Sequence, residues 1–519
     1  MYRILTGSKD AYVTNKIIGN SFRATDANTG QAATIDLFKL YAESISGSVE
    51  SPIEISRGLL KFNLAPLRQL TSSFLDISHS SFKCTLRMFD VYGGQTCPSN
   101  FKLIVFPLSK SFDEGMGRDI VTFADLDACN FITASIGGSA AIPWSRQGAG
   151  HQGLLGSDDI DIISSGNLND GNGIVDLWKS QTFATGEEDL SVDVTKIISA
   201  TLKNIIPDKG FRISYSGSQE TDRITRFVKR FASIQTSNYS NRPRLEVTYN
   251  DSTQDHHKSS FFNITGSLFL NNFHRGHYAN ILSGASVIPI TESNSLLLRL
   301  RSGSTGAGTF FEKIITASQH KIGKNYITGV YSASFCISQF SGTNLDEIRN
   351  RALENEIKNA GSATFTEIWS SLDHTVGFLT GSLVINSVNR TSFNNQSKRL
   401  IVNITNMQPQ YRRDDVTKFR VFVEDIDRPV RYKKLPFETT SQILTSLYYR
   451  IRDVDSGKVI IPFSTLEGAT LCSTDSEGMY FIFYMDSLFP GRLYTFDFLA
   501  RDAGVDQIFT DVAAHFRVV

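Results

Sequence analysis

The sequence contains little cysteine and tryptophan, and neither sign of charge is in excess. Its 519 residues include five cysteines, which form no C-x-x-C pair, and 3 tryptophans. An odd number of scattered cysteines argues against a disulfide framework and favours synthesis in a reducing cytoplasm. Lys and Arg total 52, as do Asp and Glu. No net charge therefore draws the chain towards nucleic acid or an anionic membrane.

Membrane and catalytic signals are also absent. The N-terminus has no charged region followed by an apolar core, and no apolar run approaches the ~20 residues that span a bilayer, so we expect a soluble protein. The chain carries no G-x-S-x-G or H-E-x-x-H motif and no cysteine with a nearby histidine motif. We therefore expect a protein that is not an enzyme and needs no cofactor.

Aromatic residues are abundant, and they point to β structure. The chain has 37 Phe and 17 Tyr, residues that favour pleated, half-buried surfaces. Its length is too great for one core. We predict a mainly β protein of tandem β-sandwich or jelly-roll domains, with one short helix in the middle domain. The predicted domains are 1–250 with an inserted loop at 130–186, 251–395 with a helix at 344–360, and 396–519.

The stretch 210–249 organises the first domain. It predicts a strand, a polar turn, a second strand, a loop and a closing strand that alternates apolar and polar residues. Pro243 suits the start of a strand or a sheet edge. Ile224, Phe227, Val228 and Phe231 have helical spacing, but the strand-like flanking segments favour a strand.

Several segments of the first domain resemble a known family. The order LLKFNL, LIVFPLSKSFDEG, DVT, GFRISYSGS and RPRLEVTY resembles the DNRLRE-type β-sandwich, a carbohydrate-binding-module-like jelly roll, in the versions found in structural proteins of large tailed bacteriophages. Its most specific parts are 111–115 and 242–245. The loop at 130–186 is too long for a plain connection. We expect it to lie over one face of the sandwich or to form an arm that reaches a neighbour.

The other two domains give clear local signals. Asn344 and Glu347 form a capping pattern for the predicted helix, and Gly361 ends it. After 396, about seven short strand patterns separated by turn signals predict an immunoglobulin-like sandwich. This region also resembles C-terminal domains of phage virion proteins across YYRIRDVDSGKVIIPF and GMYFIFYM.

Candidate ligand-binding residues are few, and each has a simpler structural interpretation. Four histidines, His256, His257, His274 and His277, could bind a metal if two strand ends converge, but a polar interdomain linker followed by a hairpin turn is the favoured interpretation. Oxygen ligands for calcium occur at Asp158, Asp159, Asp161, Asn167, Asn169 and Asp170 without the spacing of a calcium loop. Gly303 to Gly308 looks like a phosphate-binding loop but has no P-loop lysine.

Two further groups concern glycan and DNA. Trp144 and Trp178 flank the long loop and could stack on sugar rings, although packing in a core or an interface is favoured for them and for Trp369. Arg223, Arg226, Lys229 and Arg230 could contact DNA, although a solvated or ion-paired face is the commoner use of such a group.

The sequence thus favours a structural protein. The resemblance implies a virion component from the neck, tail or baseplate of a tailed phage, made in the host cytoplasm, with other virion proteins and copies of itself as partners. Membrane binding is not expected. The alternative is a glycan-binding adhesin whose first domain is the lectin. A glycan-cleaving enzyme would need two carboxylates about 5–10 Å apart in a cleft.

Overall fold

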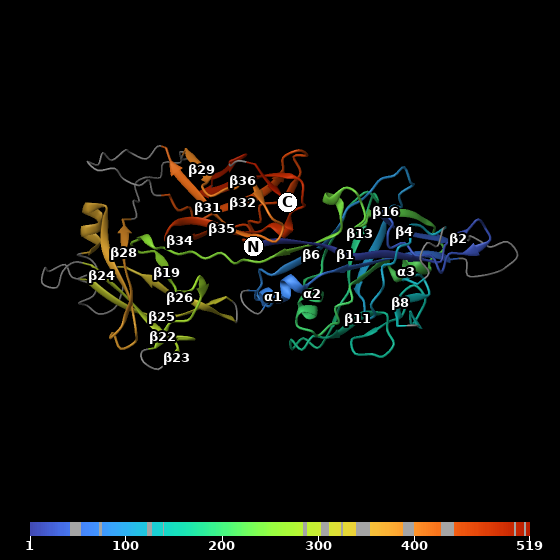
Figure 1. The fold of residues 1–519 in the computed structure, drawn as a ribbon, viewed down its shortest axis with the longest axis horizontal. Helices are drawn as coiled ribbons and strands as arrows, with labels where there is room; N and C mark the ends of the chain where they lie inside the picture. Colours follow the sequence, from blue (N-terminus) through green and yellow to red (C-terminus); the bar gives the residue numbers. More distant parts are fainter. Residues whose placement is uncertain are drawn as a thin grey trace.

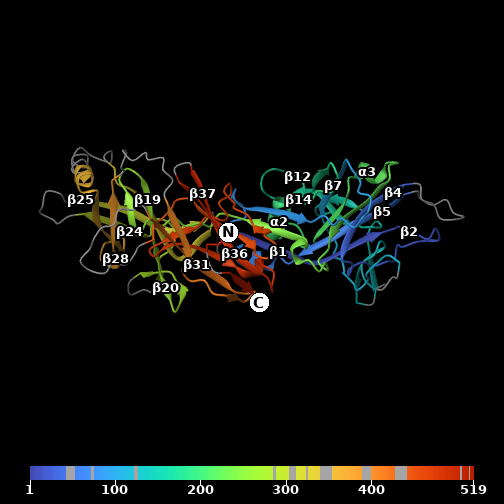
Figure 2. The same ribbon diagram turned by 90° about the horizontal axis from the view of Figure 1, so that it is seen from above.

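The computed structural model describes residues 1–519 except 42–52, 72–74, 122–126, 139, 284–287, 303–310, 323–324, 339–352, 388–398, 427–440, 503–504 and 513–514. Its three β-rich units confirm the mainly β prediction. The C-terminal unit lies between the N-terminal and middle units in both views (Figures 1 and 2). The order of the units in space therefore differs from their order along the chain, and both chain ends lie near the centre.

Strand β1 (Tyr2–Thr14) joins the two sheets of the N-terminal unit. Its first residues pair with β17 (Arg244–Thr248), and its later residues pair with β5 (Ile53–Phe62) after a register shift between Gly7 and Lys9. A Cβ atom on Gly7 would lie 2.7 Å from Cγ2 of Ile234, so a larger residue here would displace that side chain.

The remaining strands extend these two sheets on either side of β1. One sheet continues from β5 through β15 (Phe211–Tyr215) and β7 (Phe101–Pro107) to β13 (Lys179–Phe183), and the other from β17 through β6 (Lys83–Met88) to β14 (Leu190–Asp193). Strand β16 (Arg226–Ala232) pairs with β4 (Thr34–Tyr41), which pairs with β5. Leu60, Val105, Leu86 and Leu245 meet in the core between the sheets.

Residues from the predicted loop lie over the outer face of one sheet. Phe131 and Trp144 pack in a buried cluster with Val13, Leu59 and Phe106 of β1, β5 and β7. Both faces of β5 are therefore covered, with Leu59 in this cluster and Leu60 in the core between the sheets. Short strands run through this insert: β8 (Thr133–Gly137), β9 (Ala140–Pro143), β10 (Gln152–Leu154), β11 (Ile162–Asn167) and β12 (Ile174–Asp176).

Two local predictions for this unit concern the stretch with helical spacing and Pro243. The stretch with helical spacing is strand β16, as expected, and the register shift between Arg226 and Lys229 explains its irregular pattern. Pro243 directly precedes β17, which lies between β1 and β6, so it marks the start of a strand and not an edge. Helix α2 (Thr195–Leu202) follows directly after β14.

The other short elements of the N-terminal unit lie at turns and connections. They are β2 (Ile17–Ile18), β3 (Phe22–Arg23), α1 (Ala65–Thr71), α3 (Gly217–Thr221) and the 3-10 turn η1 (Tyr239–Asn241). Strands β2 and β3 form a two-stranded hairpin of their own.

The middle unit is a curved seven-stranded sheet. Its order is β18 (Lys258–Phe261), β28 (Gly377–Asn386), β27 (Ser362–Ser370), β24 (Leu296–Ser302), β25 (Phe311–Ile322), β26 (Asn325–Cys336) and β19 (Thr265–Asn271). Residues 353–360 are helical, with Leu353 and Ile357 in the core and Gly361 at φ 81° after them. The predicted cap at Asn344 and Glu347 lies outside the described residues.

The middle unit also contains two small hairpins: β20 (Phe273–His274) with β21 (His277–Tyr278), and β22 (Leu282–Ser283) with β23 (Ile288–Pro289).

The C-terminal unit has the strand order of an immunoglobulin-like sandwich. One sheet runs β29 (Leu400–Ile404), β31 (Val416–Asp425), β35 (Gly478–Tyr484) and β34 (Ser473–Asp475), and the other runs β30 (Gln410–Tyr411), β38 (Phe516–Val518), β36 (Leu493–Asp502), β32 (Leu447–Asp453) and β33 (Val459–Ile461). Strand β37 (Val505–Phe509) pairs with β36, and the 3-10 turn η2 (Met485–Ser487) follows β35. These orders correspond to the A-B-E-D and G-F-C sheets of that fold. The Tyr494 hydroxyl donates to the carbonyl of Phe489 at 2.9 Å, as a tyrosine corner does.

Aromatic packing fills the space between these two sheets. Phe419 of β31 and Phe496 of β36 pack edge to face with centroids 5.0 Å apart, where antibody domains carry an inter-sheet disulfide. Tyr449 stacks on Phe481 at 4.3 Å. All five cysteines of the chain are free. This core therefore uses the phenylalanines that the composition shows in excess, and no crosslink.

Candidate functional site

The linker between the N-terminal and middle units forms the junction of the molecule. Gln254 forms a parallel bridge with Thr474 of β34. The amide of Thr474 donates to the carbonyl of Thr253 at 2.8 Å, and the amide of Asp255 donates to Oγ1 of Thr474 at 2.8 Å. The linker thus runs along the edge strand of the C-terminal unit and pairs with it at one bridge.

A buried ionic group joins this linker to the core of the middle unit. Nδ1 of His257 lies 2.7 Å from Asp255 Oδ1, and its Nε2 lies 3.2 Å from Glu367 Oε1. Glu367 is fully buried and also accepts a hydrogen bond from the indole of Trp369 at 2.5 Å. Burial alone would lower the pKa of His257, but the two carboxylates outweigh burial and raise this pKa to about 10. The linker side chain therefore carries its charge into an otherwise apolar core.

The N-terminal and C-terminal units share a core. Tyr2 and Ile4 of β1 are buried among residues of the C-terminal sandwich. The amide of Ile4 donates to Oγ of Ser487 at 3.2 Å, and Arg3 forms an ion pair with Asp486 at 2.5 Å. Lys83 pairs with Glu467 across the same interface at 2.7 Å. The first strand of the chain is thus part of two units.

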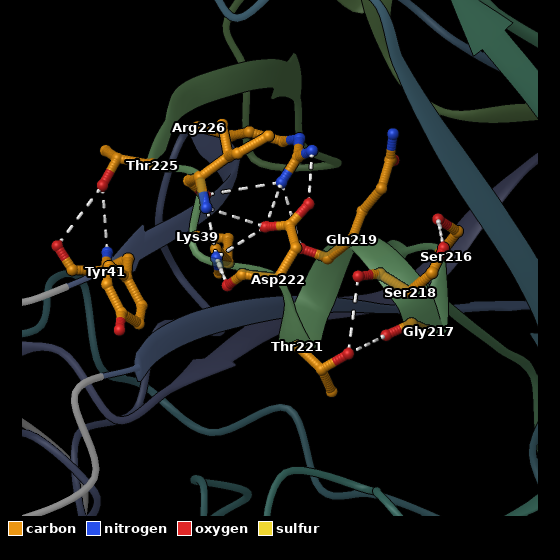
Figure 3. Close-up of polar contacts among 11 residues, drawn as sticks. Lys39, Tyr41, Ser216, Gly217, Ser218, Gln219, Thr221, Asp222, Thr225 and Arg226 are labelled. Carbon is orange, nitrogen blue, oxygen red and sulfur yellow. Dashed lines mark hydrogen bonds and ion pairs between the residues drawn. The ribbon is translucent and has the colours of Figure 1, made fainter.

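The basic group at 223–230 is largely occupied by internal ion pairs. Arg226 forms a two-pronged ion pair with Asp222, and the Lys39 ammonium donates to Oδ1 of Asp222 at 2.8 Å and to its carbonyl (Figure 3). The Arg226 and Lys39 bonds hold the pKa of Asp222 well below its usual range. Lys229, fully buried, donates to Asp90 and to the carbonyls of Gly186 and Glu188. Arg226, Lys229 and Arg230 all have carboxylate partners, so the ion-paired interpretation describes this group.

The aspartates of the insert also serve its own fold. Asp161 is fully buried and accepts hydrogen bonds from the amides of Ser145, Arg146 and His151. Asp159 is exposed and pairs with Lys110 at 3.0 Å. Within the part of the chain that the structure describes, no three His, Cys, Asp or Glu side chains are placed to hold a metal ion.

The four predicted histidines are divided between two places. His274 and His277 face each other across the exposed hairpin of β20 and β21. His256 contacts the backbone of Ser267, while His257 lies in the ionic group. The linker-and-hairpin interpretation therefore describes their positions.

The tryptophans also differ in position. Trp144 is 4% exposed and its indole donates to the carbonyl of Asn130 at 2.9 Å. This position agrees with packing in a core and leaves no ring face open to a sugar. Trp178 is 37% exposed, and Trp369 is buried in the middle unit.

Sequence reasoning missed Glu367, the most informative residue of the junction. Ala363, Phe365, Glu367 and Trp369 all face inward on β27. An acidic residue in an otherwise apolar alternation is a signal for a buried partner, although it does not identify that partner as His257.

Comparisons with known proteins leave the family open. No family model and no curated protein matches the chain. Among solved structures, a titin fragment (Titin-A168169) aligns at 6% identity and a TM-score of 0.15, over 52% of this chain and 97% of that one. A chimeric titin Z1Z2 carrying a KLER peptide from decorin aligns at 10% identity and a TM-score of 0.16, over 52% and 95%. Mouse cadherin-23 EC22-24 aligns at 12% identity and a TM-score of 0.12, over 58% and 81%.

These TM-scores are too low to carry an argument, so the sandwich assignment rests on the strand orders themselves. Among the described residues, no helix has the length and apolar character needed to cross a membrane.

Proposed function

We propose that this chain is a structural component of a tailed-phage virion, in the neck, tail or baseplate, and that it acts through protein–protein interfaces and catalyses no reaction. The observation that carries the proposal is the way in which its three units are joined. Ile4 is buried in the C-terminal unit, the linker pairs with β34, and His257 is held inside the middle unit. These contacts favour a fixed arrangement of the three units, which suits a protein that binds neighbouring virion proteins.

The extent of the surface suits this role. A specific interface removes about 800 Å² from each partner, whereas the accessible surface of this chain is 25721 Å². Several neighbours can therefore bind at once. The charges that line the internal interfaces are paired, as for Arg3 with Asp486 and Lys83 with Glu467. The partners proposed are other virion proteins and further copies of this chain.

The test is mass spectrometry of purified virus particles combined with immunogold labelling. The proposal predicts peptides at a fixed stoichiometry in the particles and gold at the neck, tail or baseplate. If infected cells contain the protein but purified particles do not, the proposal is wrong. In that case, glycan-array binding by the whole chain would be the next experiment, with Trp178→Ala as the variant, because Trp178 is the more exposed of the two candidate sugar-binding tryptophans.

A further inference from the structure

A cavity of about 200 Å³ lies where the linker passes between the middle and C-terminal units. The middle unit supplies an apolar wall from Phe269, Ile322, Ile327 and Val330, which pack together as a small cluster separate from the main core. Strand β35 supplies the facing wall. Linker residues 251–255 lie along the cavity, so all three parts of the junction contribute to it.

The facing wall is aromatic. Tyr480 and Tyr484 of β35 line the cavity, and Tyr278 reaches it from the hairpin of β20 and β21. The hydroxyl of Tyr480 lies 3.3 Å from Oγ1 of Thr253, which fixes that ring against the linker. Aromatic side chains present flat apolar faces with polar tips, and they stack well on other rings.

The charged groups that line the cavity already have partners. Asp251 binds the amine of Met1 at 2.5 Å, Asp255 binds His257, and Asp475 binds both Lys418 and Arg420. The ammonium of Lys418 also lies 3.9 Å from the centroid of the Tyr480 ring. A charged ligand would lose its hydration in this cavity and would have to compete for these partners.

Two neutral polar groups remain available on the lining. His320 packs edge-on against Phe269 with centroids 4.8 Å apart, and its Nδ1 lies 3.1 Å from Ser332 Oγ. Burial lowers the pKa of His320, so its ring is neutral at pH 7, and Nε2 of a neutral ring can take part in one hydrogen bond. Tyr278 is 46% exposed, and within the described residues its hydroxyl has no hydrogen-bond partner.

We propose that this cavity binds a small uncharged aromatic ring that carries one hydrogen-bonding group, such as a phenol. Apolar walls would supply the affinity, and Nε2 of His320 and the hydroxyl of Tyr278 would orient the polar group. The site does not depend on the proposed role in the virion, because the apolar wall and these polar groups are present in the chain whatever it assembles with.

The probe is 4-methylphenol, added to the full-length chain and followed by calorimetry and ligand-observed NMR. Its matched control is 4-hydroxybenzoate, which keeps the ring and hydroxyl but replaces the methyl group with a carboxylate. We expect saturable binding of 4-methylphenol to one site and binding of 4-hydroxybenzoate weaker by about tenfold or more, a difference of ~1.4 kcal/mol. Absence of saturable binding, or equal affinity for both compounds, would overturn the proposal.

Two substitutions test whether 4-methylphenol binds in this cavity. Ile327→Trp fills the cavity, while Ile314→Trp places the same side chain at a position 49% exposed on β25 and outside the cavity. Binding should weaken by about tenfold in I327W and stay unchanged in I314W. If circular dichroism shows that I327W does not fold, Tyr278→Phe replaces it, and a several-fold weaker affinity is then expected because only one hydroxyl is lost. Wild-type affinity in the folded cavity variant would refute the proposed location.

Discussion

Lys229 shows how single buried charges hold this molecule together. Its ammonium is fully buried and donates to Asp90, Gly186 and Glu188, which lie in two other segments of the chain. Removing one partner of such a group leaves an uncompensated buried charge, so the loss of stability is larger than the intact pair contributes. Lys39 is used in the same way, and His257 joins the linker to the middle unit. The side chains of these residues join segments that are distant in the sequence.

The charge on His257 makes stability depend on pH. The folded protein keeps the imidazolium up to its pKa of about 10, whereas the unfolded chain loses the proton near the ordinary value of 6.5. The ionic contribution is present in full below pH ~6.5 and is lost as the pH rises through about 10, at up to about 1.4 kcal/mol per pH unit. We expect the free energy of unfolding in urea to fall over this range and His257→Gln to reduce the slope.

The neighbouring His256 supplies the control. Its ring contacts the backbone of Ser267, so His256→Gln should leave the pH slope as it is in the wild type. A slope that H257Q leaves unchanged would show that the ionic group does not hold the proton.

Asp10 gives a second pH dependence within the N-terminal unit. It is 1% exposed, and burial, which outweighs a hydrogen bond from the amide of Ile234, raises its pKa to about 8. Between pH ~4 and 8 the unfolded chain is ionised at this position and the folded chain is not, so stability falls as the pH rises. Asp10→Asn keeps an acceptor for Ile234 and cannot ionise. We expect D10N to be more stable than the wild type at pH 7, with the exposed Asp158→Asn as control.

At the scale of elements, the contacts between the linker and β34 attach the middle unit to the C-terminal unit. Oγ1 of Thr474 accepts from the amide of Asp255 at 2.8 Å and donates to its carbonyl at 3.1 Å. Thr474→Val leaves both buried backbone groups without a partner, at a cost of about 1–3 kcal/mol. We expect faster hydrogen exchange and proteolysis at 250–257. Thr417→Val, on β31 of the same sheet, is the control and should leave exchange in the linker unchanged. Unaltered linker protection in T474V would mean that other contacts hold the linker.

Elements with short-range signals could be predicted from the sequence. Strands β29, β32, β35 and β36 follow from alternation and turn residues because their patterns repeat within a few residues. The exposed hairpin with His274 and His277 follows from its turn residues in the same way. The residue pattern within one strand or turn is enough to predict these elements.

Features that depend on distant segments could not be predicted. The residues that bury Trp144 and the second face of β5 meet only when the insert lies on the sheet, and no local pattern places it there. The first residues of β1 look unremarkable in sequence, yet Tyr2 and Ile4 lie in the C-terminal core. The pairing of His257 with Glu367 joins residues 110 positions apart, a contact that the linker path alone determines.

At the scale of the whole molecule, the shared core predicts which units unfold together. Ile4 is 1% exposed among C-terminal residues although it belongs to the first strand, whereas the middle unit has its own core. We expect residues 1–250 and 400–519 to unfold as one cooperative unit and the middle unit to unfold separately. Ile4→Ala should cost about 2–5 kcal/mol and should accelerate hydrogen exchange in β32 and β36 as well as in β1, but not in β24.

The exposed Ile314 of the middle unit provides the matched substitution. Ile314→Ala should leave exchange in β1, β32 and β36 as in the wild type, because the side chain is 49% exposed and lies outside the shared core. Under conditions where strands exchange through unfolding of their whole unit, I4A should lower the opening free energies of β1 and β36 by the same amount, since one event exposes both. If I4A accelerated exchange in β1 alone, the two units would unfold independently. Their contact would then be a docked interface between separate domains, and the C-terminal unit could move as a separate part.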